Sequence, residues 1–150
     1  MDSPVLAALI SAGSVIIAAA LTWHATRQQH REARAAEERV RRQGAIDAFR
    51  GRLAGSMEAM HALIDVREHG GEKDEFEDAR WLLGELGREA TLVRIHLPDE
   101  AKPKAAAAVE ELRQALNHIR SEDIGGARDA YRRSESRAAE LNDALASQED

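Results

Sequence analysis

The most constraining feature of this chain is an uncharged apolar segment, PVLAALISAGSVIIAAALTW, which fills residues 4–23. A helix rises about 1.5 Å per residue, so a segment of this length spans roughly 30 Å, the thickness of a bilayer's hydrocarbon core. Its few hydroxyl side chains can bond to carbonyls of the same helix. The segment therefore predicts one transmembrane helix, with residues 1–3 as a short tail outside the membrane.

Two other interpretations of this segment are a cleaved signal peptide and a buried helix of a soluble domain. A signal peptide has a basic region before its apolar stretch and small residues at its cleavage site. Here only the α-amino group and Asp2 precede the stretch, and its last three residues, 21–23, are bulky. A buried soluble helix normally keeps one polar face, and this segment shows none. The transmembrane helix is the favoured interpretation.

The charges after the segment predict its orientation. Trp23 stands where interfacial aromatic anchors occur, and Arg27, Arg31 and Arg34 follow it as a basic collar. Six arginines lie within about 20 residues after the segment, and no Lys or Arg precedes it. The positive-inside rule then predicts an outside N-terminus and a cytoplasmic location for residues 24–150. The collar is also suited to binding anionic lipid headgroups.

The soluble part is acidic beyond this collar. Residues 24–52 carry eight basic and four acidic side chains, whereas residues 53–150 carry thirteen basic and twenty-two acidic ones. A nucleic-acid partner needs a basic surface, so the acidic body argues against one.

Small residues form one face of the predicted span. Helices with such faces approach closely in membranes and self-associate, so we expect a homo-oligomer. The residues of this face are Ala7, Ser11, Ser14, Ala18 and Thr22.

The periodicity of the remaining chain predicts an all-α fold. Residues 24–43 contain one large apolar residue, Val40, and are expected to form a solvated helical stalk. Four stretches within residues 44–147 then repeat apolar or small residues at alternating spacings of three and four, which is typical of helices packed at shallow angles. We expect a small antiparallel four-helix bundle, coiled-coil-like, or two helical hairpins, with a thin core and with residues 148–150 as a tail. The repeats are Ile46, Phe49, Leu53, Ser56, Met60, Leu63; Phe76, Ala79, Leu83, Leu86, Ala90, Val93, Leu97; Ala105, Ala108, Leu112, Ala115, Ile119; and Ile124, Ala127, Tyr131, Ser134, Ala138, Leu141, Leu145.

Glycines and prolines predict where these helices end. Gly70-Gly71 and Pro98 follow the first two repeats, and Gly125-Gly126 marks the boundary before the last. The G-x-x-x-G at Gly51 and Gly55 is a weak signal of a close helix contact.

No residue pattern indicates catalysis. The chain lacks cysteine, which excludes disulfides and thiolate ligands, and it has no G-x-S-x-G, Walker A or G-x-G-x-x-G sequence. Glu58 and His61 match the E-x-x-H spacing of di-iron bundles, but no second copy accompanies them. We expect an exposed His61 and no metal, no cofactor and no enzymatic activity.

The third predicted helix carries a second stripe away from its seam, formed by Trp81, Gly84, Arg88, Leu92 and Ile95. One interpretation is that this helix sits inside the bundle and packs on two sides, and this is the one we favour. The other is that Trp81, Arg88, Leu92 and Ile95 anchor a protein partner, because Trp and Arg are enriched at binding hot spots.

These features predict a non-enzymatic, single-pass protein of the bacterial inner membrane, whose cytoplasmic helical domain acts as an interaction or scaffold module. The 29 alanines and the ratio of 18 Arg to 3 Lys suggest a GC-rich bacterial or phage genome. The alternative is a phage holin-like or other pore-forming lysis protein that acts through oligomers of the span. No motif assigns a family.

Overall fold

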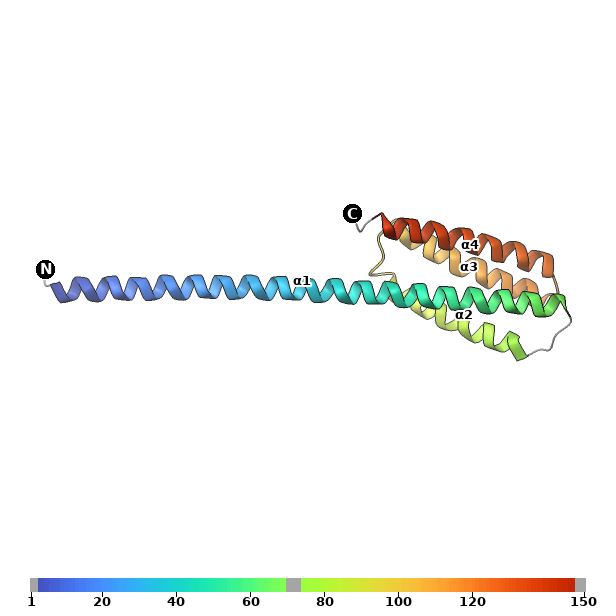
Figure 1. Ribbon diagram of the computed structural model, residues 1–150, viewed down its shortest axis with the longest axis horizontal. Coiled ribbons are helices and arrows are strands. Elements are labelled where there is room, and N and C mark those ends of the chain that lie inside the picture. The colour runs from blue at the N-terminus through green and yellow to red at the C-terminus, as the bar shows by residue number, and fades with distance from the viewer. Residues whose placement is uncertain (1–2, 70–73, 148–150) are drawn as a thin grey trace. The chain divides into compact units, whose positions relative to one another are not determined.

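The computed structural model is all-helical in the part of the chain that it describes, which confirms the predicted fold class. It describes the backbone of residues 3–69 and 74–147, and the side chains of residues 19, 21–69 and 76–147. The chain divides into two compact units, residues 1–42 and 43–150, and the first helix contributes to both. The helices are α1 (Ser3–Glu68), α2 (Asp74–Val93), α3 (Ala101–Arg120) and α4 (Ile124–Ala146) (Figure 1).

Residues 43–150 form a helical bundle, as the periodicity predicts. The second part of α1 and the three following helices run alternately in opposite directions (Figure 1). The closest pair is α3 and α4, and α2 packs on α3. Across α1 and α4, the ring of His61 stacks on Tyr131 with 5.6 Å between centroids, and Arg128 forms an ion pair with Glu68.

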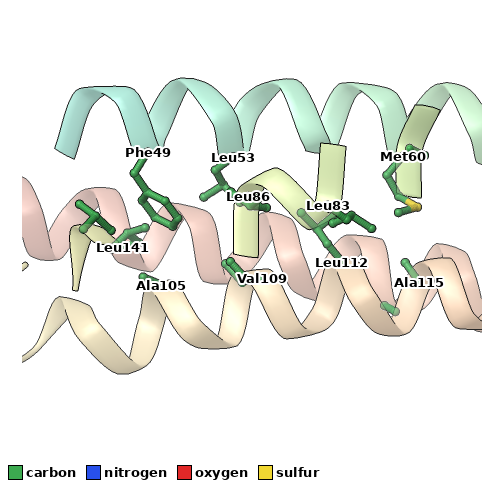
Figure 2. Close-up of a cluster of buried hydrophobic side chains, with 14 of the residues drawn as sticks. Phe49, Leu53, Met60, Leu83, Leu86, Ala105, Val109, Leu112, Ala115 and Leu141 are labelled. Carbon is green, nitrogen blue, oxygen red and sulfur yellow. The ribbon is translucent and has the colours of Figure 1, made fainter. Parts of the chain in front are cut away.

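All four helices contribute large side chains to the core, and most of its buried alanines come from α3 and α4. Phe49, Met60 and Leu86 are fully buried, whereas α3 and α4 contribute seven of the eight buried alanines. Figure 2 shows the α1 side chains reaching toward Ala105 and Ala115 of α3 and Leu141 of α4. Alanine keeps the α3–α4 pair close but buries little apolar area per residue. The thin core expected from the repeats is therefore present.

The end of α2 lies earlier than predicted. The repeat runs to Leu97, but α2 ends at Val93, whose carbonyl accepts hydrogen bonds from the amides of His96 (2.8 Å) and Leu97 (3.1 Å). Proline disfavours the helical conformation of the residue before it, so Pro98 forces Leu97 out of the helix. Leu97 nevertheless stays buried. A repeat position can thus keep its place in the core after its helix has ended.

The glycine pair of the G-x-x-x-G sequence makes no close contact. A Cβ atom built on Gly51 or Gly55 has no heavy atom of another element within 4 Å, and both residues are exposed. The weak sequence signal of a close helix contact therefore has no counterpart in the bundle. These glycines lie on the solvent side of α1, opposite the seam that contains Leu53.

Residues 21–42 of α1 are exposed throughout. Their charges pair along the helix, as in the ion pair between Arg41 and Glu37 at 2.8 Å. Among the residues that the structure describes, none of the helices is both long and apolar enough to cross a membrane. The span predicted at residues 4–23 lies outside the described side chains except for Ala19, Leu21, Thr22 and Trp23, and so does its small-residue face except for Thr22.

Candidate functional site

The predicted membrane-interface residues share one face of α1. Trp23, Arg27, Arg31 and Arg34 are three or four residues apart, which places them in a row on a helix. The guanidinium carbon of Arg27 lies 5.1 Å from the centroid of the Trp23 ring, within cation–π distance. His30 lies among these residues, in the same shallow surface hollow. An exposed aromatic ring and a row of cations thus stand together directly after the uncharged segment.

The second stripe of α2 faces solvent, so the favoured interpretation, a helix packed on two sides inside the bundle, is wrong. Trp81 is 59% exposed, Leu92 68% and Ile95 82%. The core side of α2 is the opposite one, where Ala79 and Leu86 are buried. Sequence periodicity places an apolar stripe on a helix face but does not say what covers that face. In the described structure no other element covers the face that contains Trp81 and Leu92.

Two charged residues separate the apolar residues of this stripe. The Arg88 guanidinium lies 2.6 Å from a carboxylate oxygen of Glu85, one helical turn before it. The stripe therefore reads Trp81, Glu85, Arg88, Leu92 along one face of α2, with Ile95 in the turn that follows the helix. Sequence reasoning named the arginine and the apolar members but missed Glu85.

Of the two E-x-x-H residues, Glu58 is exposed and His61 makes side-chain contacts. His61 is exposed, stacks on Tyr131 and places its Nε2 atom 3.7 Å from Asp65. Burial raises the pKa of the Tyr131 phenol, and the nearby Glu135 carboxylate adds to the effect. Within the described residues, no group of three or more histidine, aspartate or glutamate side chains is arranged to hold a metal ion.

Gly125 and Gly126 mark a helix boundary, as predicted, and the second supports a polar cluster there. The Asp123 carboxylate accepts a hydrogen bond from the Gly126 amide at 2.9 Å, and His118 Nδ1 lies 2.8 Å from it. The hydrogen bond from the Gly126 amide lowers the pKa of the Asp123 carboxyl most, and the hydrogen bond with His118 lowers it further. A Cβ on Gly126 would stand 2.2 Å from the Asp123 carboxylate, so only glycine leaves room for this cap. The cluster stabilises the start of α4.

A groove between α2 and α3 gathers basic residues that sequence reasoning missed. Its lining includes Arg94, Lys102 and Arg113. Lys102 pairs with Asp99 at 2.6 Å and Arg113 with Glu110 at 2.9 Å, so the groove carries little net charge. No sequence signal points to this groove, because its basic residues come from the turn after α2 and from two separate turns of α3.

Comparison of the chain with protein families, with curated proteins and with solved structures finds no match in any of the three.

Proposed function

We propose that this protein is a non-enzymatic, single-pass membrane-anchored interaction protein, in which residues 4–23 cross a bacterial inner membrane and residues 44–147 form a cytoplasmic helical module. The observation that carries the proposal is the face formed by Trp23, Arg27, Arg31 and Arg34. It begins at the last residue of an uncharged segment long enough to span a bilayer.

The chemistry of this face fits the headgroup region of a membrane. An indole ring prefers the boundary between lipid tails and headgroups, and arginine pairs with phosphate through several N–H donors. Each arginine near an anionic surface contributes about 1 kcal/mol to binding. Arg27 lies over the Trp23 ring, so the two side chains would occupy the interface together.

The orientation rests on the six arginines that follow the segment, which favour a cytoplasmic bundle. Reporter fusions at the C-terminus test this orientation. We expect an active fluorescent protein and inactive alkaline phosphatase at that position. The reverse pattern would mean that the bundle lies outside the cytoplasm.

The bundle supports a binding role. Its core is Ala-rich, and the α2 face that contains Trp81 and Leu92 exposes these large apolar side chains beside the Glu85–Arg88 ion pair. Exposed apolar faces of this kind commonly mark protein contacts.

Membrane anchoring is tested by alkaline carbonate extraction combined with intact mass. We expect the full-length protein to stay in the membrane pellet with residues 4–23 retained. Ala12→Arg places a charge near the middle of the span, where it costs about 2.5–3.5 kcal/mol, and should move protein to the soluble fraction. Gln28→Arg adds the same charge on the flank and should change nothing. A soluble product that starts near residue 24 would refute the anchor.

The holin-like alternative is favoured by one feature, the small-residue face of the span that includes Ser11, Ser14 and Ala18. Controlled expression separates the two functions. A holin-like protein stops growth abruptly and dissipates the membrane potential, and Ser14→Leu should abolish that effect by blocking close helix approach. An anchored interaction protein leaves the membrane potential intact at equal expression.

A further inference from the structure

We propose that the exposed stripe of α2 binds the same stripe of a second copy, with the two α2 helices packed antiparallel about a two-fold axis. The stripe consists of the exposed Trp81, Arg88 and Leu92 together with Glu85, whose side chain is 24% exposed, and is called the α2 stripe below. This contact does not depend on the membrane anchor, because every residue in it lies in the unit formed by residues 43–150.

The four residues of the α2 stripe lie on one face of the helix. Their spacings of four, three and four residues keep them on one face of a helix with 3.6 residues per turn. This face lies opposite the core side of α2, which contains the buried Leu83 and Leu86. The α2 stripe is therefore free to meet another molecule without disturbing the bundle.

The order of residues along the α2 stripe is self-complementary. Read in either direction, an apolar residue stands at each end and two opposite charges stand between them. About a midpoint between Leu86 and Gly87, a two-fold axis places Trp81 opposite Leu92 of the second copy and Glu85 opposite Arg88. Each apolar residue then meets an apolar residue and each charge meets its opposite. A two-fold contact uses the same surface on both subunits, so self-complementarity of this kind is what such a contact requires.

A parallel pairing of the same stripe is unfavourable. It would place Arg88 opposite the other copy's arginine and Glu85 opposite the other glutamate, and like charges across an interface oppose association. In the single chain, Glu85 and Arg88 are paired with each other at 2.6 Å. An antiparallel contact lets each of them keep this partner and gain a second one.

The size of the α2 stripe sets the expected strength. From Trp81 to Leu92 the helix rises only about 16 Å, so the contact falls at the low end of specific interfaces. We expect a reversible dimer with a Kd of about 10–100 µM.

Charge reversal in the full-length protein, measured by analytical ultracentrifugation in detergent, tests the contact. Positions 85 and 88 face each other at two places in the dimer. Glu85→Arg alone or Arg88→Glu alone therefore creates two pairs of like charges, and each should raise the dimer Kd by at least about tenfold. The double variant Glu85→Arg/Arg88→Glu restores opposite charges and should return the Kd to within about threefold of the wild type. Glu110→Arg, which breaks the ion pair with Arg113 at the same i,i+3 spacing on α3, is the matched control and should have no effect.

The apolar contact between Trp81 and Leu92 of the second copy is tested separately. Trp81→Ala should weaken dimerisation, whereas Val40→Ala, which shortens an exposed apolar residue outside the α2 stripe, should not. Both changes are at exposed positions, and circular dichroism will show that the bundle still folds. In a Trp23→Phe background, Trp81 is the remaining tryptophan, and its emission should move to shorter wavelengths as the protein is concentrated.

Where the wild-type protein dimerises, two results would overturn the proposal. One is a dimer whose Kd is unchanged by both single reversals, which would place the association elsewhere, for example in the span. The other is a double variant that dimerises no better than the single ones, which would exclude the antiparallel pairing of Glu85 with Arg88. A wild-type protein that stays monomeric up to millimolar concentration would equally refute it.

Discussion

Residues 21–42 and residues 43–68 belong to the same helix, α1, but different forces stabilise them. In the first stretch every side chain is exposed, including Trp23 and Val40. In the second, Phe49, Met60 and Leu63 are almost fully buried in the bundle core. One continuous helix therefore contains a stretch without a packed face and a stretch that forms a wall of the core.

The difference shows that helix formation and tertiary packing are separate requirements. The first stretch is rich in Ala, Arg, Gln and Glu, which have high helix propensity, and pairs such as Arg41 and Glu37 add a few tenths of a kcal/mol each. These local contributions stabilise the helix itself but do not pack it against another element. The second stretch gains several kcal/mol from burial, so it should unfold only together with the bundle.

The largest expected effect comes from truncating the core side of α1. Phe49→Ala removes a fully buried ring and should lower the free energy of unfolding by about 3–5 kcal/mol. Val40→Ala removes methyl groups from an exposed position on the same helix and should change it by less than about 0.5 kcal/mol. Thermal unfolding of the full chain, followed by circular dichroism, measures both. Equal effects of the two changes would contradict the contrast between the two stretches.

Removing a buried hydroxyl on the core side of α1 should change the free energy of unfolding by less than Phe49→Ala does, and in the opposite direction. The Ser56 Oγ atom is buried and has no hydrogen-bond partner in the structure. Ser56→Ala removes a polar group whose desolvation is not compensated and should raise the free energy of unfolding by about 1 kcal/mol. Ser136→Ala on the exposed side of α4 controls for helix propensity and should gain less than about 0.5 kcal/mol. A destabilised Ser56→Ala would show that the hydroxyl is bonded in solution.

Glycine and alanine exchanges test whether the two stretches are energetically coupled. Gly51→Ala is made in open space on the solvent side of the bundle part of α1 and should raise the free energy of unfolding by about 0.5–1 kcal/mol. Ala33→Gly is the reverse exchange in the exposed stretch and should leave bundle unfolding unchanged. A drop in the bundle's melting temperature with Ala33→Gly would mean that the two stretches unfold as one unit.

The smallest effect is expected for an ion pair of the exposed stretch. Glu37→Ala removes the partner of Arg41, a contact at 2.8 Å between two well-exposed side chains. Pairs of this type contribute about 0.3–0.5 kcal/mol to the local helix. Amide exchange near residue 37 should become faster by a factor of about two, with no change in bundle unfolding. A shift in bundle stability would reveal a contact of this stretch that the structure does not show.

Much of the bundle could be predicted from the sequence because burial follows helical periodicity. The repeat positions of α3, from Ala105 to Ile119, are all buried, and so are most of those on the other helices. The repeats missed Val109, since α3 contacts both α2 and α4 and therefore buries a wider face than one seam. They also extended α2 to Leu97, because the pattern continues past Val93, where the helix ends.

The candidate sites were less predictable for a physical reason. The stripe that contains Trp81 and Leu92 has the same hydropathy whether it packs inside a bundle or faces solvent, so the sequence did not decide between the two. The role of Gly126 depends on side chains of two elements, Asp123 and His118, which meet only in the folded chain. In contrast, the alignment of Trp23 with Arg27 follows directly from their spacing on one helix.

Hydrogen exchange measured by mass spectrometry on the full-length protein in lipid nanodiscs is the most direct test of a membrane-anchored bundle. The account predicts three zones along α1: slow exchange in residues 4–23, where lipid would exclude water, fast exchange in residues 24–42, and slow exchange in residues 46–64, which the core protects. Exchange of residues 4–23 as fast as that of residues 24–42 would contradict the account, because it would leave the bundle without a membrane anchor.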